Sequence, residues 1–435
     1  MMKRNILSYL LLLASQAYFL FSTAQVADKD DVKRIIETLA SDDMRGRAAL
    51  SKDIERAADF IADEFKSVGL QSYTEENYRQ TFYMTKVNSL EQQVIINGTT
   101  LKNEDFVMIS SAPQVSWNQD STVETLEIKA GEDFSQRFRE IVRNNPNSNI
   151  VWVDPSFGPM LQRFKKIFPK ESVVPKQDNV EDGPSKVFIL KKEPVQTFQI
   201  NAATRREDFP LFNVAAVLPG KSKPDEFVIF SAHYDHIGVL DAVEQDSIAN
   251  GADDDASGTT AVISLAKHFK KLNKNERTLI FVAFTAEEIG MFGSKYFSNQ
   301  IDPDKVVAMI NMEMIGKDSK FGPNSLYITG YNASNLGQLM QENLKGTEFT
   351  FHPDPYPQQN LFYRSDNAVL AALGVPAHTF STVQIDQDDY YHTVSDEVET
   401  LDIENIVSSI EAIAKGVEGI VQGTQTPSRV EKLRD

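Results

Sequence analysis

The sequence predicts an α/β fold: a mixed, largely parallel central sheet with helices on both faces, together with a smaller, mostly β insertion. Three continuous apolar runs have the length of buried strands, and they occupy residues 227–230, 278–284 and 306–310. Stretches with helical spacing of apolar residues separate or follow these runs, at residues 260–272, 365–373 and 403–421. Strands that are apolar throughout are covered on both faces, so their alternation with helices is typical of a sheet between two helical layers.

The chain is long enough for more than one folding unit. Its 435 residues suggest two or three domains, or one large domain that carries an insertion. Near the N-terminus, residues 51–69 show the apolar spacing of a helix that ends at a glycine. Between residues 81 and 205 the pattern changes to short β-like runs, such as 93–96 and 149–153, with Pro-rich and charged stretches between them. We therefore expect one domain made of residues 25–80 and 206–425, an insertion at 81–205, and a polar tail at 426–435.

The composition excludes several classes of protein. Hydrophobic residues make up 41% of the chain and aromatic residues 10%, which suffices for a core and excludes both a disordered chain and a multi-span membrane protein. The 62 acidic residues exceed the 44 basic ones, and the net charge of −18 disfavours binding to nucleic acid. Because the chain has no cysteine, it has no disulfide, no catalytic thiol and no cysteine-ligated metal. A metal site would have to use carboxylates and some of the six histidines.

The N-terminal residues have the order of charged, apolar and small residues found in secretory signal peptides. Lys3 and Arg4 precede an apolar run at residues 6–21, and Ser22-Thr-Ala24 then supplies the small residues of a cleavage site. The run of about 16 residues is shorter than the roughly 20 that span a membrane comfortably. We expect a signal peptide at residues 1–24, a periplasmic or secreted mature protein, and no membrane attachment after cleavage.

Clusters of metal-ligating residue types follow the predicted strands. They are His233-Tyr-Asp235-His236, Asp253-Asp-Asp255, Glu287-Glu288, Asn311-Met-Glu313 and Tyr391-His-Thr393. Each cluster alone has a structural explanation, because acidic residues also cap helices and a lone histidine is usually an ordinary polar residue. Ligands of α/β sheets bind where loops leave the carboxyl ends of strands, and the clusters are expected there. Carboxylates gathered in one place repel each other unless cations neutralise them, so the sequence predicts a metal site.

The same clusters, in the same order, resemble the motifs of the M28 family of co-catalytic zinc aminopeptidases. The matching segments read His233-Tyr-Asp235, Gly251-Ala-Asp-Asp-Asp-Ala-Ser-Gly258, Ala286-Glu-Glu-Ile-Gly-Met-Phe-Gly-Ser294, Asn311-Met-Glu-Met-Ile-Gly316 and Tyr391-His-Thr393. The resemblance extends to Ser41-Asp-Asp-Met-Arg-Gly-Arg47, Arg364-Ser-Asp366 and Gly374-Val-Pro-Ala377. It implies a zinc-exopeptidase-like fold. Many relatives carry a protease-associated domain where this chain has its insertion, although the insertion has no specific motif of such a domain.

The resemblance implies two zinc ions per chain and a set of ligands for them. His233 and Glu313 would bind one zinc ion, Glu288 and His392 would bind the other, and Asp254 would bridge the two. Three carboxylates and one hydroxide ion would then balance the charge of the two ions, and each ion would keep an exchangeable position.

Further roles follow from the same resemblance. Asp235 would orient His233, and Glu287 would act as the general base. From the residues themselves, apart from the resemblance, we expect Tyr391, next to His392, to donate a hydrogen bond to the developing oxyanion, and Arg364 to hold a carbonyl or carboxylate group of the substrate. An aromatic ring that packs beside the site and a surface arginine are the alternative interpretations of the last two residues.

The sequence departs from the family pattern at two positions. Glu313 stands where the family usually has Asp, and Asn367 stands where it commonly has His, so Asn367 receives no role. The other histidines also receive none; they are His236, His268, His352 and His378.

We therefore expect a metallo-exopeptidase that removes residues from the N-terminus of peptide substrates. Three alternatives remain open on the same fold. The first is a carboxypeptidase, the second is a glutaminyl cyclase with one zinc ion, and the third is a peptide-binding protein without activity. Glu287 argues against the third alternative, and the motifs do not distinguish which substrate terminus is bound.

Overall fold

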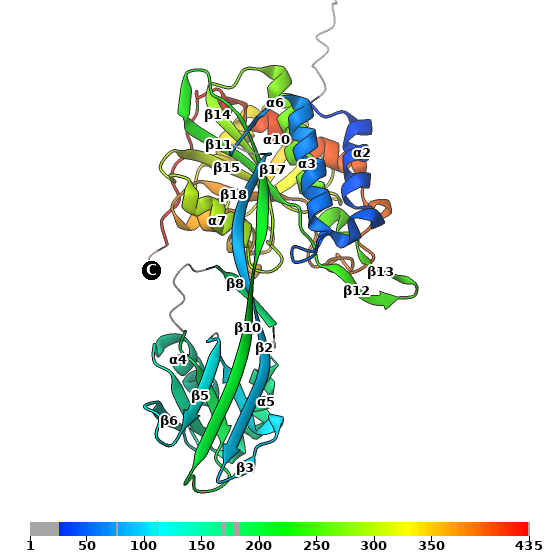
Figure 1. Ribbon diagram of the computed structural model, residues 1–435. Coiled ribbons are helices and arrows are strands. Elements are labelled where there is room, and N and C mark those ends of the chain that lie inside the picture. The colour runs from blue at the N-terminus through cyan, green and yellow to red at the C-terminus, as the bar shows by residue number, and fades with distance from the viewer. Residues whose placement is uncertain (1–25, 75–76, 111, 167–170, 177–182, 434–435) are drawn as a thin grey trace, which may run out of the picture. The chain divides into compact units, whose positions relative to one another are not determined.

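The computed structural model describes residues 26–74, 77–110, 112–166, 171–176 and 183–433 (Figure 1). They form two compact units: one joins the chain up to Gln80 with the chain from Phe212 onward, and the other is Thr81–Leu211. The predicted insertion, 81–205, ends slightly before the second unit does, because strand β10 (Phe198–Leu218) runs across the boundary. The predicted signal peptide, residues 1–24, lies outside the described residues.

The larger unit is built around one mixed sheet. Its strands follow the order β17-β16-β18-β15-β11-β14-β10, and the short β1 also pairs with β10. Their bounds are β1 Gln71–Ser72, β11 Lys223–His233, β14 Arg277–Phe284, β15 Val306–Met312, β16 Ser325–Ile328, β17 Thr350–Pro353 and β18 Ala377–Ser381. The central strands β18, β15, β11 and β14 are parallel, whereas β10 and β16 run antiparallel to β14 and β18. The mixed, largely parallel sheet predicted from the sequence is thus confirmed.

Each central strand packs against a core on both of its faces. In β11, Val228 and Phe230 belong to the core on one face, and Ile229 belongs to the core on the other. Phe281 and Val282 of β14 divide in the same way. Successive side chains of a strand point to opposite faces, so burial on both sides explains why the middle of each of these strands is a continuous apolar run.

Helices cover both faces of the sheet (Figure 1). The core on the first face includes residues of α2 (Lys29–Leu39), α3 (Ile54–Val68), α6 (Gly258–Leu272), α8 (Leu336–Asn343), α10 (Ile403–Gly416) and α11 (Glu418–Val421). The core on the second face includes residues of α7 (Phe292–Gln300) and α9 (Asn367–Ala372). Side-chain caps fix the starts of α2 and α10, where Asp28 accepts from the N–H of Asp31 and Asp402 accepts from the N–H of Glu404.

The predicted helices correspond to helices in the structure, with shifted ends. The helix predicted at 51–69 is α3, which ends at Gly69 in the left-handed conformation, with φ of 76°. The stretch 403–421 divides into α10 and α11. Helix α2 was not predicted, although its apolar positions have helical spacing and are buried; they are Val32, Ile35, Ile36 and Leu39. Within the predicted polar tail, Val430 is buried against the second-face core.

The smaller unit contains a four-stranded sheet in the order β4-β9-β7-β6. The bounds are β4 Phe106–Ile109, β6 Glu124–Ile128, β7 Asn149–Val153 and β9 Lys186–Leu190. Helices α4 (Phe134–Asn144) and α5 (Gly158–Lys165) accompany it, in a region expected to be mostly β. Further strands of this unit are β3 Thr99–Thr100, β5 Gln114–Asn118, β8 Glu171–Pro175 and most of β2 (Arg79–Ile96) and β10. Across the described residues of both units, each helix is too short or too polar to cross a membrane.

Candidate metal centre

The carboxyl ends of three neighbouring parallel strands bring the predicted site residues to one edge of the sheet. His233 is the last residue of β11, and Glu313 directly follows β15. Glu287 and Glu288 follow β14 after a short turn. Asp254 lies in η4 (Ala252–Ser257), the irregular turn that leads into α6. The fold therefore places these side chains together because β11 pairs in parallel with both β14 and β15.

Three of these side chains form a first group of ligand-type atoms. His233 Nε2 lies 3.2 Å from Oδ1 of Asp254 and 3.3 Å from Oε1 of Glu313. His233 and Asp254 are almost completely buried, and the side chain of Glu313 is 19% exposed. One imidazole nitrogen and two carboxylate oxygens thus converge within the distances that a shared cation would bridge.

A second group forms around the other oxygen of Asp254. His392 Nε2 lies 3.2 Å from Oδ2 of Asp254 and 2.9 Å from Oε2 of Glu288. The side chain of His392 is 36% exposed, so this group opens toward solvent. The two oxygens of Asp254 therefore face two separate groups, and the carboxylate lies between them.

His236 joins the second group, although no role was expected for it from the sequence. Its Nδ1 lies 2.8 Å from Oε1 of Glu288 and 3.7 Å from Oδ2 of Asp254, and the ring is buried. The ring also meets the ring of His392 edge to face, at 5.7 Å between centroids. The available signal was its position directly after Asp235, at the end of the same strand. That position alone does not reveal that the side chain of His236 points toward Glu288. The structure shows it, because the chain turns after β11.

Unpartnered polar atoms in the second group indicate a site for a cation. Among the described residues, several buried atoms have no hydrogen-bond partner, and they include Asp254 Oδ2 and His392 Nε2 of the second group. Buried polar atoms are rarely left without partners unless an ion or water completes them. Imidazole nitrogens and carboxylate oxygens, without sulfur, are a donor set that suits zinc.

The carboxylates of the site raise the pKa values of two of its histidines, His233 and His392. The carboxylates of Asp254 and Glu288 beside its Nε2 raise the pKa of His392 to about 10. Burial lowers the pKa of His233, but Glu313 and Asp254 outweigh burial and raise it well above its usual value. Protons on these imidazoles therefore take the place of metal charge among the carboxylates, and a metal would have to displace them.

Asp235 and Glu287 lie beside the first group. His233 Nδ1 is 3.0 Å from the backbone oxygen of Asp235 and 3.8 Å from its carboxylate, so the closer partner of His233 is the backbone. Oδ1 of Asp235 instead accepts a hydrogen bond from the N–H of Glu287, at 3.1 Å. Burial raises the pKa of Asp235 to about 7, and burial also raises the pKa of Glu287 well above its usual range. A carboxyl group with a raised pKa is suited to accept and return a proton.

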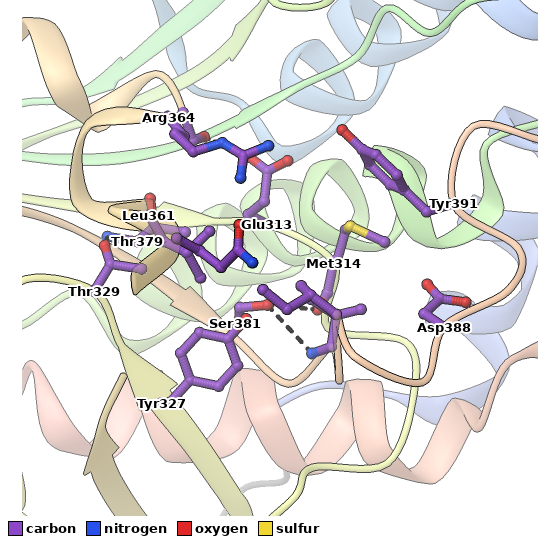
Figure 2. Close-up of a pocket in the computed structure, with 14 residues that line it drawn as sticks. Glu313, Met314, Tyr327, Thr329, Leu361, Arg364, Thr379, Ser381, Asp388 and Tyr391 are labelled. Carbon is purple, nitrogen blue, oxygen red and sulfur yellow. Dashed lines mark hydrogen bonds between the residues drawn. The ribbon is translucent and has the colours of Figure 1, made fainter. Parts of the chain in front are cut away.

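A pocket of about 270 Å³ opens beside the first group, and Figure 2 shows Arg364, Glu313 and Tyr391 at the same end of it. Apolar side chains form much of its wall, namely those of Met314, Leu361, Val383 and Ile385. Arg364 is exposed. The ring of Tyr391 stacks on His392, at 3.9 Å between centroids, and burial raises the pKa of its phenol. The two residues predicted to contact substrate therefore lie at the mouth of a cavity that adjoins the metal centre.

The fold and the site together define the class: an α/β protein with two adjacent histidine–carboxylate groups, built on the carboxyl ends of parallel strands. Residues 213–417 match the family model described as Peptidase family M28, so this segment of the chain is similar to that family.

Individual relatives are similar to this chain over part of their length. A "Probable zinc metalloprotease" of Leptosphaeria maculans is 31% identical over 129 residues, which are 29% of this chain and 29% of the relative. A "Probable leucine aminopeptidase" of Arthroderma otae is 27% identical over 234 residues, which are 52% of this chain and 60% of the relative. The chain thus spans less than two thirds of either of these curated relatives.

A solved structure shares the fold over most of the chain. The aminopeptidase from Aneurinibacillus sp. strain AM-1 superimposes with a TM-score of 0.53 at 18% identity. The match covers 94% of this chain and 96% of that protein.

Proposed function

We propose that this protein is a zinc-dependent aminopeptidase that hydrolyses peptides from the N-terminus with two zinc ions per chain. The observation that carries the proposal is the placement of Asp254. Its Oδ1 faces His233 and its Oδ2 faces His392, each at 3.2 Å, as a carboxylate that bridges two cations requires. The names of the relatives, a zinc metalloprotease and a leucine aminopeptidase, support the same activity.

The residues would divide the ligation between two positions. His233 and Glu313 would hold one ion, and His392 and Glu288 the other, with Asp254 shared. Zinc bound there supplies a water of lowered pKa and polarises the carbonyl group of the scissile bond.

The chain's own groups would move the protons of the reaction. Glu287 is buried and its pKa is raised, so it would take a proton from the attacking water and return it to the leaving amine. The phenol of Tyr391 would donate a hydrogen bond to the oxygen that gains charge, and Arg364 would bind a carbonyl or carboxylate of the peptide. The apolar pocket would receive a substrate side chain.

The test uses purified protein and short peptides. We expect about two zinc ions per chain by elemental analysis, stepwise release of amino acids from an unblocked peptide, and no cleavage of the same peptide after N-terminal acetylation. Glu287→Gln should keep its zinc and lose turnover by about 10²–10⁴-fold. The exposed Glu348→Gln is the matched control and should keep wild-type turnover.

Other results would identify the alternatives. C-terminal cleavage of the acetylated peptide would indicate a carboxypeptidase. Loss of ammonia from a peptide with N-terminal Gln, with one zinc ion bound, would indicate a glutaminyl cyclase. Zinc binding without any reaction would indicate a peptide-binding protein.

We also propose that the mature protein is periplasmic or secreted. The proposal rests on Lys3, Arg4 and the apolar run that follows them in the sequence. Cell fractionation and N-terminal sequencing should find a mature chain that begins at Gln25 outside the cytoplasm. A cytoplasmic chain that begins at residue 1 would contradict the proposal.

A further inference from the structure

Arg47 is a buried cation that the proposed mechanism does not use. Its side chain is fully buried, and the guanidinium donates hydrogen bonds to four backbone carbonyls. Nε donates to Tyr234 at 2.8 Å, and Nη1 donates to Leu39 and Asn250, each at 2.6 Å. Nη2 donates to Gly251 at 2.9 Å. Burying a guanidinium group costs hydration free energy unless its N–H groups are hydrogen-bonded. The four carbonyls offset that cost, so the surroundings of Arg47 are shaped to hold it.

Three of the four acceptors of Arg47 belong to the two segments that carry proposed ligands, and the fourth, Leu39, ends α2. Tyr234 lies between His233 and Asp235, and Asn250 and Gly251 open the loop that leads to Asp254. The backbone of Arg47 takes part as well, because its oxygen accepts the N–H of His236 at 3.2 Å. One residue therefore ties the end of β11 to the turn that carries the shared carboxylate.

The backbone around Arg47 is shaped for this position. Arg45, Gly46 and Arg47 all adopt the left-handed conformation, with φ of 50°, 66° and 48°. A Cβ atom at Gly46 would lie 2.5 Å from the oxygen of Ala249 and 2.6 Å from that of Gly238, so only glycine fits. This explains Gly46 and Arg47 within the Arg-Gly-Arg sequence at 45–47, which the family resemblance includes but to which it gives no role.

The charge of Arg47 also acts on the site. The carboxylates of Asp254, Asp396, Asp235 and Asp255 are close enough to interact with it electrostatically. The hydrogen bonds of its guanidinium go to carbonyls, and among the described residues it forms no ion pair that would cancel its charge. An arginine keeps its charge even when buried, and it therefore offsets repulsion among these carboxylates whether or not a metal is bound.

We propose that Arg47 is a positioning residue of the metal centre, which sets the distance between His233 and Asp254 by holding both segments through their carbonyls. The proposal rests on the proposed function, because it assumes that these residues bind zinc. This role differs from that of an arginine that only stabilises the fold. Arg277 is such an arginine and serves for comparison. Arg277 is also buried and donates to the carbonyls of Ile420 and Gln425, but it contacts none of the proposed ligands.

The experiment compares Arg47→Lys and Arg47→Gln with Arg277→Lys in the full chain. Lysine keeps the charge but loses the planar fork of donors, and glutamine keeps two N–H donors and is easier to bury. Zinc affinity is measured by competition with a chelator, and the absorption spectrum of the cobalt-substituted protein reports ligand geometry. We expect the Arg47 variants to bind zinc about tenfold to a hundredfold more weakly and to have an altered cobalt spectrum. Substitutions of residues that orient metal ligands have effects of this size. Arg277→Lys should lower the melting temperature and leave both readouts unchanged.

Wild-type zinc affinity and an unchanged cobalt spectrum in a folded Arg47 variant would overturn the inference. If Arg47→Lys does not fold, Arg47→Gln can still be measured, because it does not bury an ammonium group. A wild-type chain that binds no zinc would overturn the proposed function itself. Zinc binding that is unchanged by substitution of Arg47 would overturn only the inference about Arg47.

Discussion

Ser365 donates a hydrogen bond to Oε2 of Glu313, and Oε1 of the same carboxylate lies 3.3 Å from Nε2 of His233. Ser365 is itself held by Asn311, whose Nδ2 donates to its Oγ at 2.9 Å. Asn311 in turn accepts from Oγ of Ser231 in the neighbouring strand, at 2.7 Å. This series of hydrogen bonds fixes one oxygen of the longer Glu313 side chain and leaves the other for a metal.

The first prediction concerns Ser365. Ser365→Ala should weaken zinc binding about tenfold, because the free oxygen of Glu313 can then rotate away from its position beside His233. The measurement is chelator competition. Ser334→Ala is the matched control, since Ser334 is also buried and hydrogen-bonded but contacts His378 instead. Equal zinc affinity in the two variants would contradict the prediction.

Glu313 itself gives the second prediction. Glu313→Ala should lower the zinc content toward one ion per chain, because one group loses a carboxylate while the group around His392 keeps both of its own. Glu313→Asp should retain both ions. Elemental analysis distinguishes the two variants, and full zinc content with full activity in the alanine variant would show that Glu313 is not a ligand.

The third prediction concerns protons released on zinc binding. Without metal, the pKa of His392 is about 10 and that of His233 is also raised, so both imidazoles carry protons at neutral pH. A metal binds the neutral imidazole, so zinc affinity should increase with pH between 6 and 8, by about tenfold per pH unit for each proton released. Calorimetry in two buffers with different ionisation enthalpies counts these protons. Heats that do not depend on the buffer would contradict the prediction.

The fourth prediction concerns His378, which lies in β18 and contacts Ser334 Oγ and the carbonyl of Thr329. Burial lowers its pKa to about 4, below the value of about 6.5 for an unfolded chain. Its contribution to stability is therefore present above pH 6.5 and is lost as the pH falls toward 4, by about 3 kcal/mol in total.

His378→Gln should remove this contribution. Denaturant unfolding of the metal-free protein at several pH values should then show a shallower loss of stability below pH 6.5 in the variant than in wild type. A loss of equal steepness in both proteins would show that His378 does not titrate as its burial implies.

The fifth prediction concerns Tyr391, whose ring stacks on His392 while its phenol lies at the mouth of the pocket. Tyr391→Phe keeps the ring and the stacking but removes the donor, so kcat should fall by about 10²–10³-fold with unchanged zinc content. An unaltered kcat would leave the ring with a packing role only.

The sequence was sufficient to predict the parts of this protein that depend on local pattern. The apolar runs of β11, β14 and β15 predicted the sheet, and strand ends predicted where His233, Glu288 and Glu313 would meet. The hydrogen bond from Ser365 to Glu313 and the contact of His236 with Glu288 could not be predicted. Both depend on how segments far apart in the chain approach each other, and no spacing in the sequence encodes that approach.

The role proposed for Arg47 could not be predicted from the sequence either, because its hydrogen-bond partners are backbone carbonyl groups. Every residue has a carbonyl, so an arginine that binds only carbonyls leaves no pair of complementary side chains to find in the sequence. The acceptor of His233 shows the same effect, because the backbone of Asp235 lies closer to it than the carboxylate does.

The loop that carries Asp254 is anchored from both ends of the polypeptide. Arg47 holds its start, and the carboxylate of Asp396 accepts the N–H groups of Asp253 and Asp254 at 3.1 and 3.0 Å. A ribosome completes Arg47 early and Asp396 late, so a nascent chain cannot assemble this loop until nearly all of it has been translated. The segment that matches the family, 213–417, contains every residue proposed to bind zinc but not Arg47. The shortest gene fragment that encodes a fully supported centre must therefore begin well upstream of that segment.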